Sequence, residues 1–272
     1  MTLDQPGSCM DAFSDMGYWK WEGVPSEALV RSAVGFMERV LEVNPEAKLL
    51  DLGCGLGLHA IELVRRGYQV TAMDCSEPFL ADAKRRAAEA GVTVHFVHGD
   101  MSRMGFDAEF DAVVLWGNTF GMLSDEDNRS TLLGISRGLR QGGLALIDTQ
   151  NYTALPGELK QSWSFSDDEP NLLFLIQDTK DVCKGRFGFD VIVVNLKTGD
   201  RHTMPFSWRL YLLPELERLL TDAGLHLVGV YGDDPAKVDW AAFTRGDPYP
   251  YSTDGFTDSA AKRILLCQKR AA

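Results

Sequence analysis

Residues 51–57 read Asp-Leu-Gly-Cys-Gly-Leu-Gly, a glycine-rich stretch with a carboxylate at its head. The stretch begins within the β-rich run Lys48 to Leu52 and leads into a helical pattern that ends at Gly67. Open α/β sheets bind nucleotides where a first strand turns into a first helix, because glycines there let a ligand approach the backbone. The stretch therefore predicts a ligand site at the carboxyl end of the first strand.

Around this stretch the chain alternates short strand patterns with helical patterns, which is typical of a parallel sheet covered by helices. This alternation predicts an α/β fold with a doubly wound, seven-stranded, mostly parallel sheet. The expected strands cover residues 48–52, 69–73, 92–97, 110–116, 144–148, 225–231 and 263–268.

Two regions depart from the alternation. Residues 172–211 hold apolar runs separated by the turn signals Lys184-Gly185 and Thr198-Gly199-Asp200, which predict an inserted antiparallel meander. Residues 232–260 form a long polar connection that carries aromatic residues, and connections of that length are usually functional or mobile.

The composition narrows the range of partners and compartments. The 272 residues include 27 Lys and Arg against 39 Asp and Glu, a net charge of −12, which argues against nucleic acid or an acidic membrane as a partner. The five cysteines are scattered without metal-type spacing, as expected for reduced thiols, so we expect a cytoplasmic protein. No apolar stretch approaches the ~18 residues of a membrane span, and no His/Cys/Asp cluster has the spacing of metal ligands. We expect no targeting segment and no metal.

A second carboxylate narrows the ligand. Asp74 ends the second expected strand 21 residues after Gly53, the spacing at which a carboxylate can accept hydrogen bonds from a ribose diol. Dinucleotide enzymes and enzymes that bind a nucleoside sulfonium share this feature. The G-x-G-x-x-A pattern of Gly55, Gly57 and Ala60 keeps a Rossmann-type NAD(P)-dependent oxidoreductase as an alternative. Asp51 favours the sulfonium, because a carboxylate there repels a pyrophosphate and attracts a cation.

The chain resembles the class I S-adenosylmethionine-dependent methyltransferases, particularly the bacterial small-molecule enzymes with an antiparallel lid. The matching segments are LLDLGCGLGLHAIELVRRGYQVTAMDCSEPFL (49–80), HFVHGDM (95–101), FDAVVLWGNTFGML (110–123) and LRQGGLALIDTQNY (139–152). The resemblance implies S-adenosylmethionine as the methyl donor, S-adenosylhomocysteine as the product, and a Rossmann-like core with an inserted lid.

The resemblance also implies roles for individual residues around the cofactor. The methionyl part would lie against Asp51, Gly53 and Gly55, the ribose against Asp74, and the adenine against Cys75, Asp100 and Met101, with Trp116 near the sulfonium. The aromatic N-terminal segment separately leads us to expect that Trp19 and Tyr18 close the remaining side and pack against the cofactor. Trp116 has a plainer interpretation as core, and His59 is more simply structural than catalytic.

The division of the chain follows from the same resemblance. We expect an N-terminal helical lid at 1–44, a methyltransferase core at 45–152 and 211–272, and an inserted antiparallel lid at 153–210 over the acceptor site. Oligomeric state stays open between monomer and homodimer. A non-catalytic S-adenosylmethionine-binding protein is a further alternative, but covering elements are needed to exclude water rather than to sense a ligand.

The sequence indicates less about the methyl acceptor than about the cofactor. Nitrogen is favoured over oxygen or carbon as the acceptor atom, because no residue set resembling a dedicated base appears and a neutral amine needs none. His202 follows a turn signal and is more simply an exposed loop residue. The candidates for positioning a small-molecule acceptor are Tyr18, Asn118, Tyr152 and His202, with Tyr211 as a further possibility.

Overall fold

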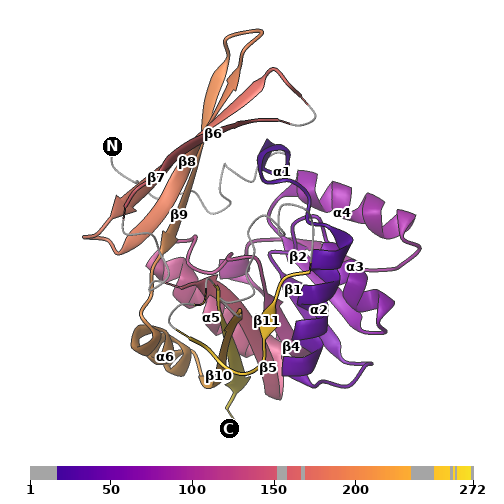
Figure 1. The fold of residues 1–272 in the computed structure, drawn as a ribbon. Coiled ribbons are helices and arrows are strands. Elements are labelled where there is room, and N and C mark those ends of the chain that lie inside the picture. The colour runs from indigo at the N-terminus through magenta and orange to yellow at the C-terminus, as the bar shows by residue number, and fades with distance from the viewer. Residues whose placement is uncertain are drawn as a thin grey trace.

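The computed structural model describes residues 17–151, 158–166, 169–233, 248–257, 260 and 262–270. Their strands form two sheets, a large one in the body of the molecule and a four-stranded one that projects from it (Figure 1). No helix within these ranges is long and apolar enough to cross a membrane.

The large sheet has the order β11-β10-β12-β5-β4-β1-β2-β3. Strands β1 to β5 pair in parallel, whereas β12 runs antiparallel to both β5 and β10. Its strands are β1 (Lys48–Leu52), β2 (Gln69–Asp74), β3 (His95–His98), β4 (Phe110–Leu115), β5 (Leu139–Gln150), β10 (Leu225–Asp233), β11 (Tyr251–Ser252) and β12 (Lys262–Lys269). The predicted fold class is confirmed.

One strand of this sheet was not expected. The segment 232–260 reads as a connection, yet its residues Tyr251 and Ser252 form β11, which pairs with Asp233 and Gly232 at the end of β10. Two residues carry no periodicity, so the sequence holds no signal for this strand.

Helices cover both faces of the large sheet (Figure 1). On one face, α2 (Glu27–Leu41), α3 (Leu58–Arg65) and α4 (Glu77–Glu89) enclose an apolar core that includes Phe36 and Leu49. On the other face, α5 (Asp125–Gly138) and α6 (Leu213–Asp222) enclose a second core that includes Phe120 and Ile135. The sheet is therefore buried on both faces, as a parallel sheet requires.

The order of the strands fixes where a ligand can bind. From β1 the chain moves outward to β2 and β3, then returns to β4 on the other side of β1. Helices on opposite faces leave a crevice at such a switch point, outside the carboxyl ends of β1 and β4. The turns after these two strands touch, because a Cβ at Gly53 would lie 3.2 Å from Cγ2 of Thr119.

The second sheet is inserted between β5 and α6. It consists of β6 (Gln161–Phe165), β7 (Leu172–Asp181), β8 (Arg186–Asn195) and β9 (Arg201–Arg209), all antiparallel. The last three are the predicted meander. Strand β6 was missed, because its five residues are all exposed and its sequence QSWSF reads as a polar segment.

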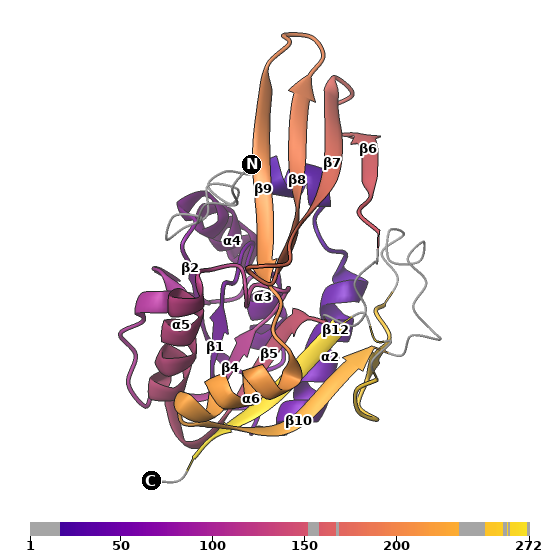
Figure 2. The ribbon, with the colours of Figure 1, turned by 90° about the vertical axis from the view of Figure 1, so that its left-hand side faces the viewer.

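We call this second sheet the lid sheet. One face of it is apolar, with Phe206 and Trp208 of β9 packed together with Val191 of β8 and Met122 of the core. Figure 2 shows β6 to β9 standing above the carboxyl end of the large sheet, with the short helix α1 (Gly17–Glu22) beside them.

Arg186 fixes the base of the lid sheet to the core. Its guanidinium donates hydrogen bonds to the carbonyls of Gly121, Met122 and Leu123, and also to Ser207 on the neighbouring strand. The backbone N–H of Arg209 donates to the Gly121 carbonyl at 2.8 Å. The base of the lid sheet is thus tied to the loop that follows β4.

Replacing this arginine tests the attachment. Arg186→Ala removes one donor from each of three core carbonyls, so we expect a loss of about 1.5–3 kcal/mol. The loss should appear as faster amide hydrogen exchange in β8 and β9, with β1 and β4 unchanged. Arg201→Ala, at the exposed far end of β9, is the matched control. Equal exchange in both variants would show that Arg186 does not hold the lid sheet.

Candidate active site

Asp51 lies at the centre of the crevice. It is 2% exposed, and its Oδ2 atom is buried without a hydrogen-bond partner. Burial and repulsion from Asp74 raise the pKa of its carboxyl from 3.8 to about 7, although the backbone N–H of Ala60 in the first turn of α3 opposes the shift. An anion held this way gains from any cation placed beside it.

Asp74 holds the glycine-rich turn in place. Its two carboxylate oxygens accept the backbone N–H groups of Gly55 and Ser76, both at 2.8 Å. The N–H groups of Gly53 and Cys54 donate to the carbonyl of Met73 beside it. Burial raises the pKa of Asp74, and these backbone hydrogen bonds counteract that rise. Further lone pairs on each oxygen remain to accept hydroxyl groups.

Gly55 shows why glycine is needed in this turn. It has a φ of +53°, and a Cβ at this position would lie 3.3 Å from Cζ2 of Trp19. The indole of Trp19 also lies 5.9 Å from the ring of Phe79 in α4. Trp19 therefore covers the turn between β1 and α3.

Helix α1 joins the core to the lid sheet. Two residues after Trp19, the ring of Trp21 lies 5.4 Å from Phe189 and 5.7 Å from Phe206 on the apolar face of the lid sheet. One short helix thus contacts the glycine-rich turn with one indole and the lid sheet with the other.

Asp100 ends the loop after β3. Its Oδ1 accepts the backbone N–H and the hydroxyl of Ser102, and Oδ2 is buried without a hydrogen-bond partner, 3.8 Å from Nε of Arg103. Met101 is partly buried beside it. A carboxylate oxygen without a hydrogen-bond partner can accept the amino group of adenine, which is the role expected for Asp100.

Cys75 is disulfide-bonded, contrary to the expectation that all thiols stay reduced.

Trp116 lies in the core rather than at the surface of the crevice. It is 7% exposed and packs against Phe36, Tyr251 and His59 at ring distances of 6.0, 5.4 and 6.5 Å. Burial and the nearby charge of Lys262 lower the pKa of His59 to about 4, so its imidazole is neutral at pH 7. These contacts favour the plainer interpretation of Trp116.

Asn118 is the acceptor candidate that the structure brings to the crevice. Its backbone has a φ of +57°, its Oδ1 is buried without a partner, and its carbonyl accepts the indole N–H of Trp208 at 2.6 Å. Its backbone N–H and that of Gly117 donate to Oδ2 of Asp148, at 3.3 and 3.2 Å.

A buried ion pair at this place was not foreseen. Asp148, at the carboxyl end of β5, is fully buried, and Nζ of Lys262 lies 3.1 Å from its Oδ2. The sequence does hold a signal for Asp148, because it ends a strand just as Asp51 and Asp74 do. Lys262 carries no such signal, since its position depends on the antiparallel pairing of β12 with β5.

The other acceptor candidates do not meet at the crevice among the described residues. The side chain of Tyr18 and all of Tyr152 lie outside those residues. His202 is exposed, within β9 rather than in a loop. Tyr211 is buried, and its hydroxyl is occupied by Asn128 and Asp125.

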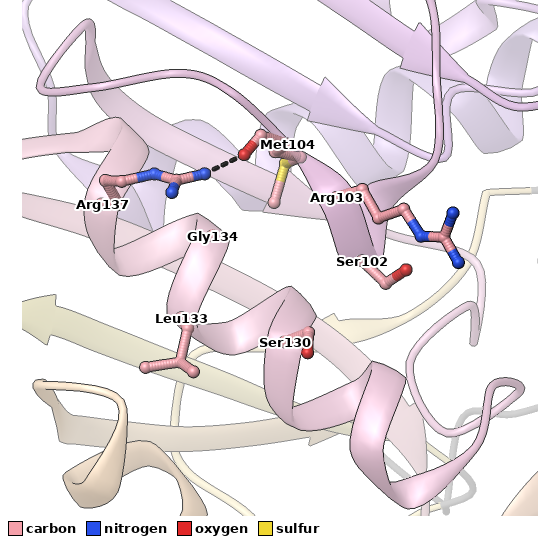
Figure 3. Close-up of a pocket in the computed structure, with 7 residues that line it drawn as sticks. All are labelled: Ser102, Arg103, Met104, Ser130, Leu133, Gly134 and Arg137. Carbon is pink, nitrogen blue, oxygen red and sulfur yellow. Dashed lines mark hydrogen bonds between the residues drawn. The ribbon is translucent and has the colours of Figure 1, made fainter.

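A second hollow lies elsewhere, between α5 and the short helix η2 (Met101–Arg103) (Figure 3). The guanidinium of Arg137 is occupied there by the carbonyls of Met104 and Phe106. Its lining residues are Ser102, Arg103, Met104, Ser130, Leu133, Gly134 and Arg137, none of them a predicted site residue. No group of three or more His, Cys, Asp or Glu residues in the described part of the chain could hold a metal ion.

Comparisons with known proteins agree with this geometry. Residues 49–143 match the family described as a methyltransferase domain. The chain is 27% identical to YqeM of Bacillus subtilis (strain 168), over 69% of this chain and 77% of YqeM. It is 30% identical to a glycine/sarcosine N-methyltransferase of Aphanothece halophytica, over 51% of this chain and 54% of that protein, so it spans about half of this relative.

A solved structure shows the same fold over nearly the whole chain. The CcbJ methyltransferase from Streptomyces caelestis has a TM-score of 0.73 and 19% identity, with 96% of this chain and 98% of CcbJ covered. Residues 49–143 thus form a methyltransferase domain, and the chain is an enzyme that uses S-adenosylmethionine as its methyl donor. The alternatives of a NAD(P)-dependent oxidoreductase and of a non-catalytic binding protein are wrong.

The residues present fit S-adenosylmethionine. Oδ2 of Asp51 and Oδ2 of Asp100 are buried without a hydrogen-bond partner, so they can accept cationic or N–H groups of a ligand, and the glycine-rich turn lies between Asp74 and the indole of Trp19. The cofactor carries a sulfonium and an α-ammonium group, and its adenine carries an amino group. Charge and hydrogen-bonding capacity therefore correspond along the whole crevice.

Removing the charge of Asp51 tests whether its carboxylate attracts the sulfonium of the cofactor. We expect Asp51→Asn to weaken S-adenosylmethionine by about tenfold and S-adenosylhomocysteine by less, because the homocysteine product lacks the sulfonium charge. Calorimetry with both ligands measures this, and Asp111→Asn at the opposite end of β4 is the control. Equal losses for the two ligands would refute a role with the sulfonium.

The same variant should stabilise the ligand-free protein. The pKa of Asp51 is raised on folding from 3.8 to about 7, so wild-type stability falls as pH rises from about 4 and levels off above 7. Asp51→Asn lacks this fall, and its melting temperature should exceed that of wild type at pH 8 more than at pH 5. A constant difference between the two proteins would contradict the raised pKa.

Proposed function

We propose that the enzyme transfers the methyl group to a nitrogen atom of a small molecule. The observation that carries this proposal is a pair of buried acceptor oxygens, Oδ1 of Asn118 and Oδ1 of Asp148, both without a hydrogen-bond partner. The two residues are joined by the hydrogen bond from the Asn118 backbone N–H to Asp148. Buried acceptors require donors, and the N–H groups of an amine are donors. The name of the glycine/sarcosine relative supports the same acceptor atom.

The chain's residues would act by holding and desolvating the amine. When bound, S-adenosylmethionine supplies a methyl group on a positively charged sulfur, which keeps the electron pair of the broken bond. Asn118 and Asp148 would fix the N–H groups of the amine, so that its lone pair points toward the methyl carbon. The nitrogen lone pair forms the new bond, and the extra proton leaves with the product as an ammonium ion. No internal base is needed.

The division into covering elements and core belongs to this proposal. Residues 1–44 would act as an N-terminal lid and residues 153–210 as an inserted lid over the acceptor, with the core at 45–152 and 211–272. The contacts of Trp19 and Trp21 support a lid role for α1. His202 lies on β9 in alternation with Met204, Phe206 and Trp208, so it belongs to the apolar face of the lid sheet, where it could meet a bulky acceptor. Tyr18 and Tyr152 stay candidates for positioning the acceptor.

A panel of acceptors tests the nature of the acceptor atom. Purified enzyme with S-adenosylmethionine is incubated with matched amines, phenols and alcohols, and tandem mass spectrometry locates the added methyl group. We expect it on nitrogen. Methylated phenols or alcohols together with untouched amines would overturn the assignment.

Truncation tests the N-terminal lid. Deleting residues 1–22 removes α1, whereas the large sheet and the helices from α2 onward retain their own cores. We expect turnover to fall by at least about tenfold with a small change in melting temperature, because water then reaches the crevice. Trp21→Ala, which removes the ring contacts with the lid sheet, should reproduce part of the loss. Full turnover in the truncated enzyme would show that α1 serves only for packing.

A further inference from the structure

Only one of the two oxygens of the Asp148 carboxylate accepts hydrogen bonds. Its Oδ2 accepts three donors, the N–H groups of Gly117 and Asn118 and the ammonium of Lys262. Its Oδ1 accepts none, although the residue has no exposed surface. A buried carboxylate oxygen without a donor is costly, so its retention indicates a donor that arrives with a ligand.

Other ionisable groups gather around the same lysine. Glu22, the last residue of α1, retains exposed surface, yet the surrounding protein desolvates its carboxyl and raises its pKa while Lys262 lowers it. The exposed side chain of Glu22 thus carries its negative charge within the electrostatic field of Lys262. His59 also lies in the field of Lys262. We call Glu22 of α1, His59 of α3, Asp148 of β5 and Lys262 of β12 the Lys262 cluster.

The charge of Lys262 is already balanced. Burial alone lowers its pKa, but attraction to Asp148 and to Asp233 outweighs this effect, and the pKa is raised. Arg263, the next residue of β12, lies on the opposite face of the strand and donates to the carbonyls of Gln150 and Tyr211. The described residues of the Lys262 cluster thus carry more negative than positive charge, and Oδ1 of Asp148 is a free hydrogen-bond acceptor among them.

We propose that Oδ1 of Asp148 binds the reacting nitrogen, and that the acceptor is a small amine without a carboxylate group. This inference rests on the proposed N-methyl transfer and narrows it. A substrate carboxylate would meet Glu22 and Asp148 and find the charge of Lys262 already neutralised. Lys262 is a positioning residue, because it holds the carboxylate of Asp148 in place through Oδ2 and does not itself meet the acceptor.

Matched pairs of probes test the substrate class in the wild-type enzyme. Protein saturated with S-adenosylhomocysteine is titrated calorimetrically with phenethylamine against phenylalanine, ethanolamine against serine, and methylamine against glycine. Each pair differs by one carboxylate. We expect the amine of at least one pair to bind about tenfold or more tightly than its carboxylate partner. Equal or tighter binding of the amino acids, or no binding by any amine, overturns the inference.

Variants test the role of Asp148 with the preferred amine. Asp148→Asn turns an amide N–H toward the reacting nitrogen, so the Kd of the amine should rise by about tenfold or more while that of S-adenosylhomocysteine stays unchanged. Asp111→Asn, the same change at the amino end of β4, should alter neither value. An unchanged amine affinity in Asp148→Asn contradicts the proposal. Should this variant fail to fold, the wild-type pairs still decide.

Lys262 is tested by rescue. Lys262→Met should raise KM for the amine more than it lowers kcat, and Lys262→Arg should restore most of KM, because an arginine can still donate to Oδ2 of Asp148. A loss that Lys262→Arg does not rescue would contradict positioning through the ion pair. If the amino acids bind well and are methylated on nitrogen, this inference fails while N-methyl transfer stands. Methylation on oxygen would instead refute the proposed function itself.

Discussion

The structure depends on a buried negative charge that the protein leaves uncompensated. Asp51 and Asp74 end adjacent parallel strands, and their repulsion together with burial holds the pKa of Asp51 at about 7. The backbone offsets part of this cost, through the first turn of α3 for Asp51 and through Gly55 and Ser76 for Asp74. The remainder is offset when a cationic ligand binds. The crevice is thus less stable empty than filled, as expected where function and stability conflict.

This constraint explains the surrounding architecture. A charge that attracts a sulfonium works only where water is excluded, so the crevice needs a cover. Helix α1 is our candidate for this cover, since Trp19 lies over Gly55 and Trp21 packs on the lid sheet. The lid sheet in turn is fixed to the loop after β4, through Arg186 and through the indole N–H of Trp208 on the carbonyl of Asn118. Helix α1, the lid sheet and the loop after β4 are therefore linked by direct contacts.

The sequence predicts the part of the site that depends on local pattern. A carboxylate at the end of a strand, a glycine-rich turn and a capping serine are all short-range signals, and Asp51, Gly55, Asp74 and Ser76 lie where those signals place them. The alternation of strands and helices likewise indicates the parallel, doubly wound sheet.

The rest of the site depends on pairing between distant segments. Lys262 reaches Asp148 because β12 enters the sheet antiparallel to β5, and no local pattern in the sequence indicates that direction. Trp116 ends an apolar strand, which suits both core and ligand contact, and its neighbours Phe36 and Tyr251 come from elements far away in the chain. Strands β6 and β11 form by pairing with β7 and β10, and their own residues carry no strand pattern.

Proton release on cofactor binding tests the central claim most directly. Calorimetry of S-adenosylmethionine binding to the wild-type enzyme, in buffers of different ionisation enthalpy, gives the number of protons exchanged. With the pKa of Asp51 at about 7 and a cation arriving beside it, binding at pH 7 should release about half a proton, and the release should vanish near pH 9. Proton uptake, or no exchange at pH 7, would contradict the account.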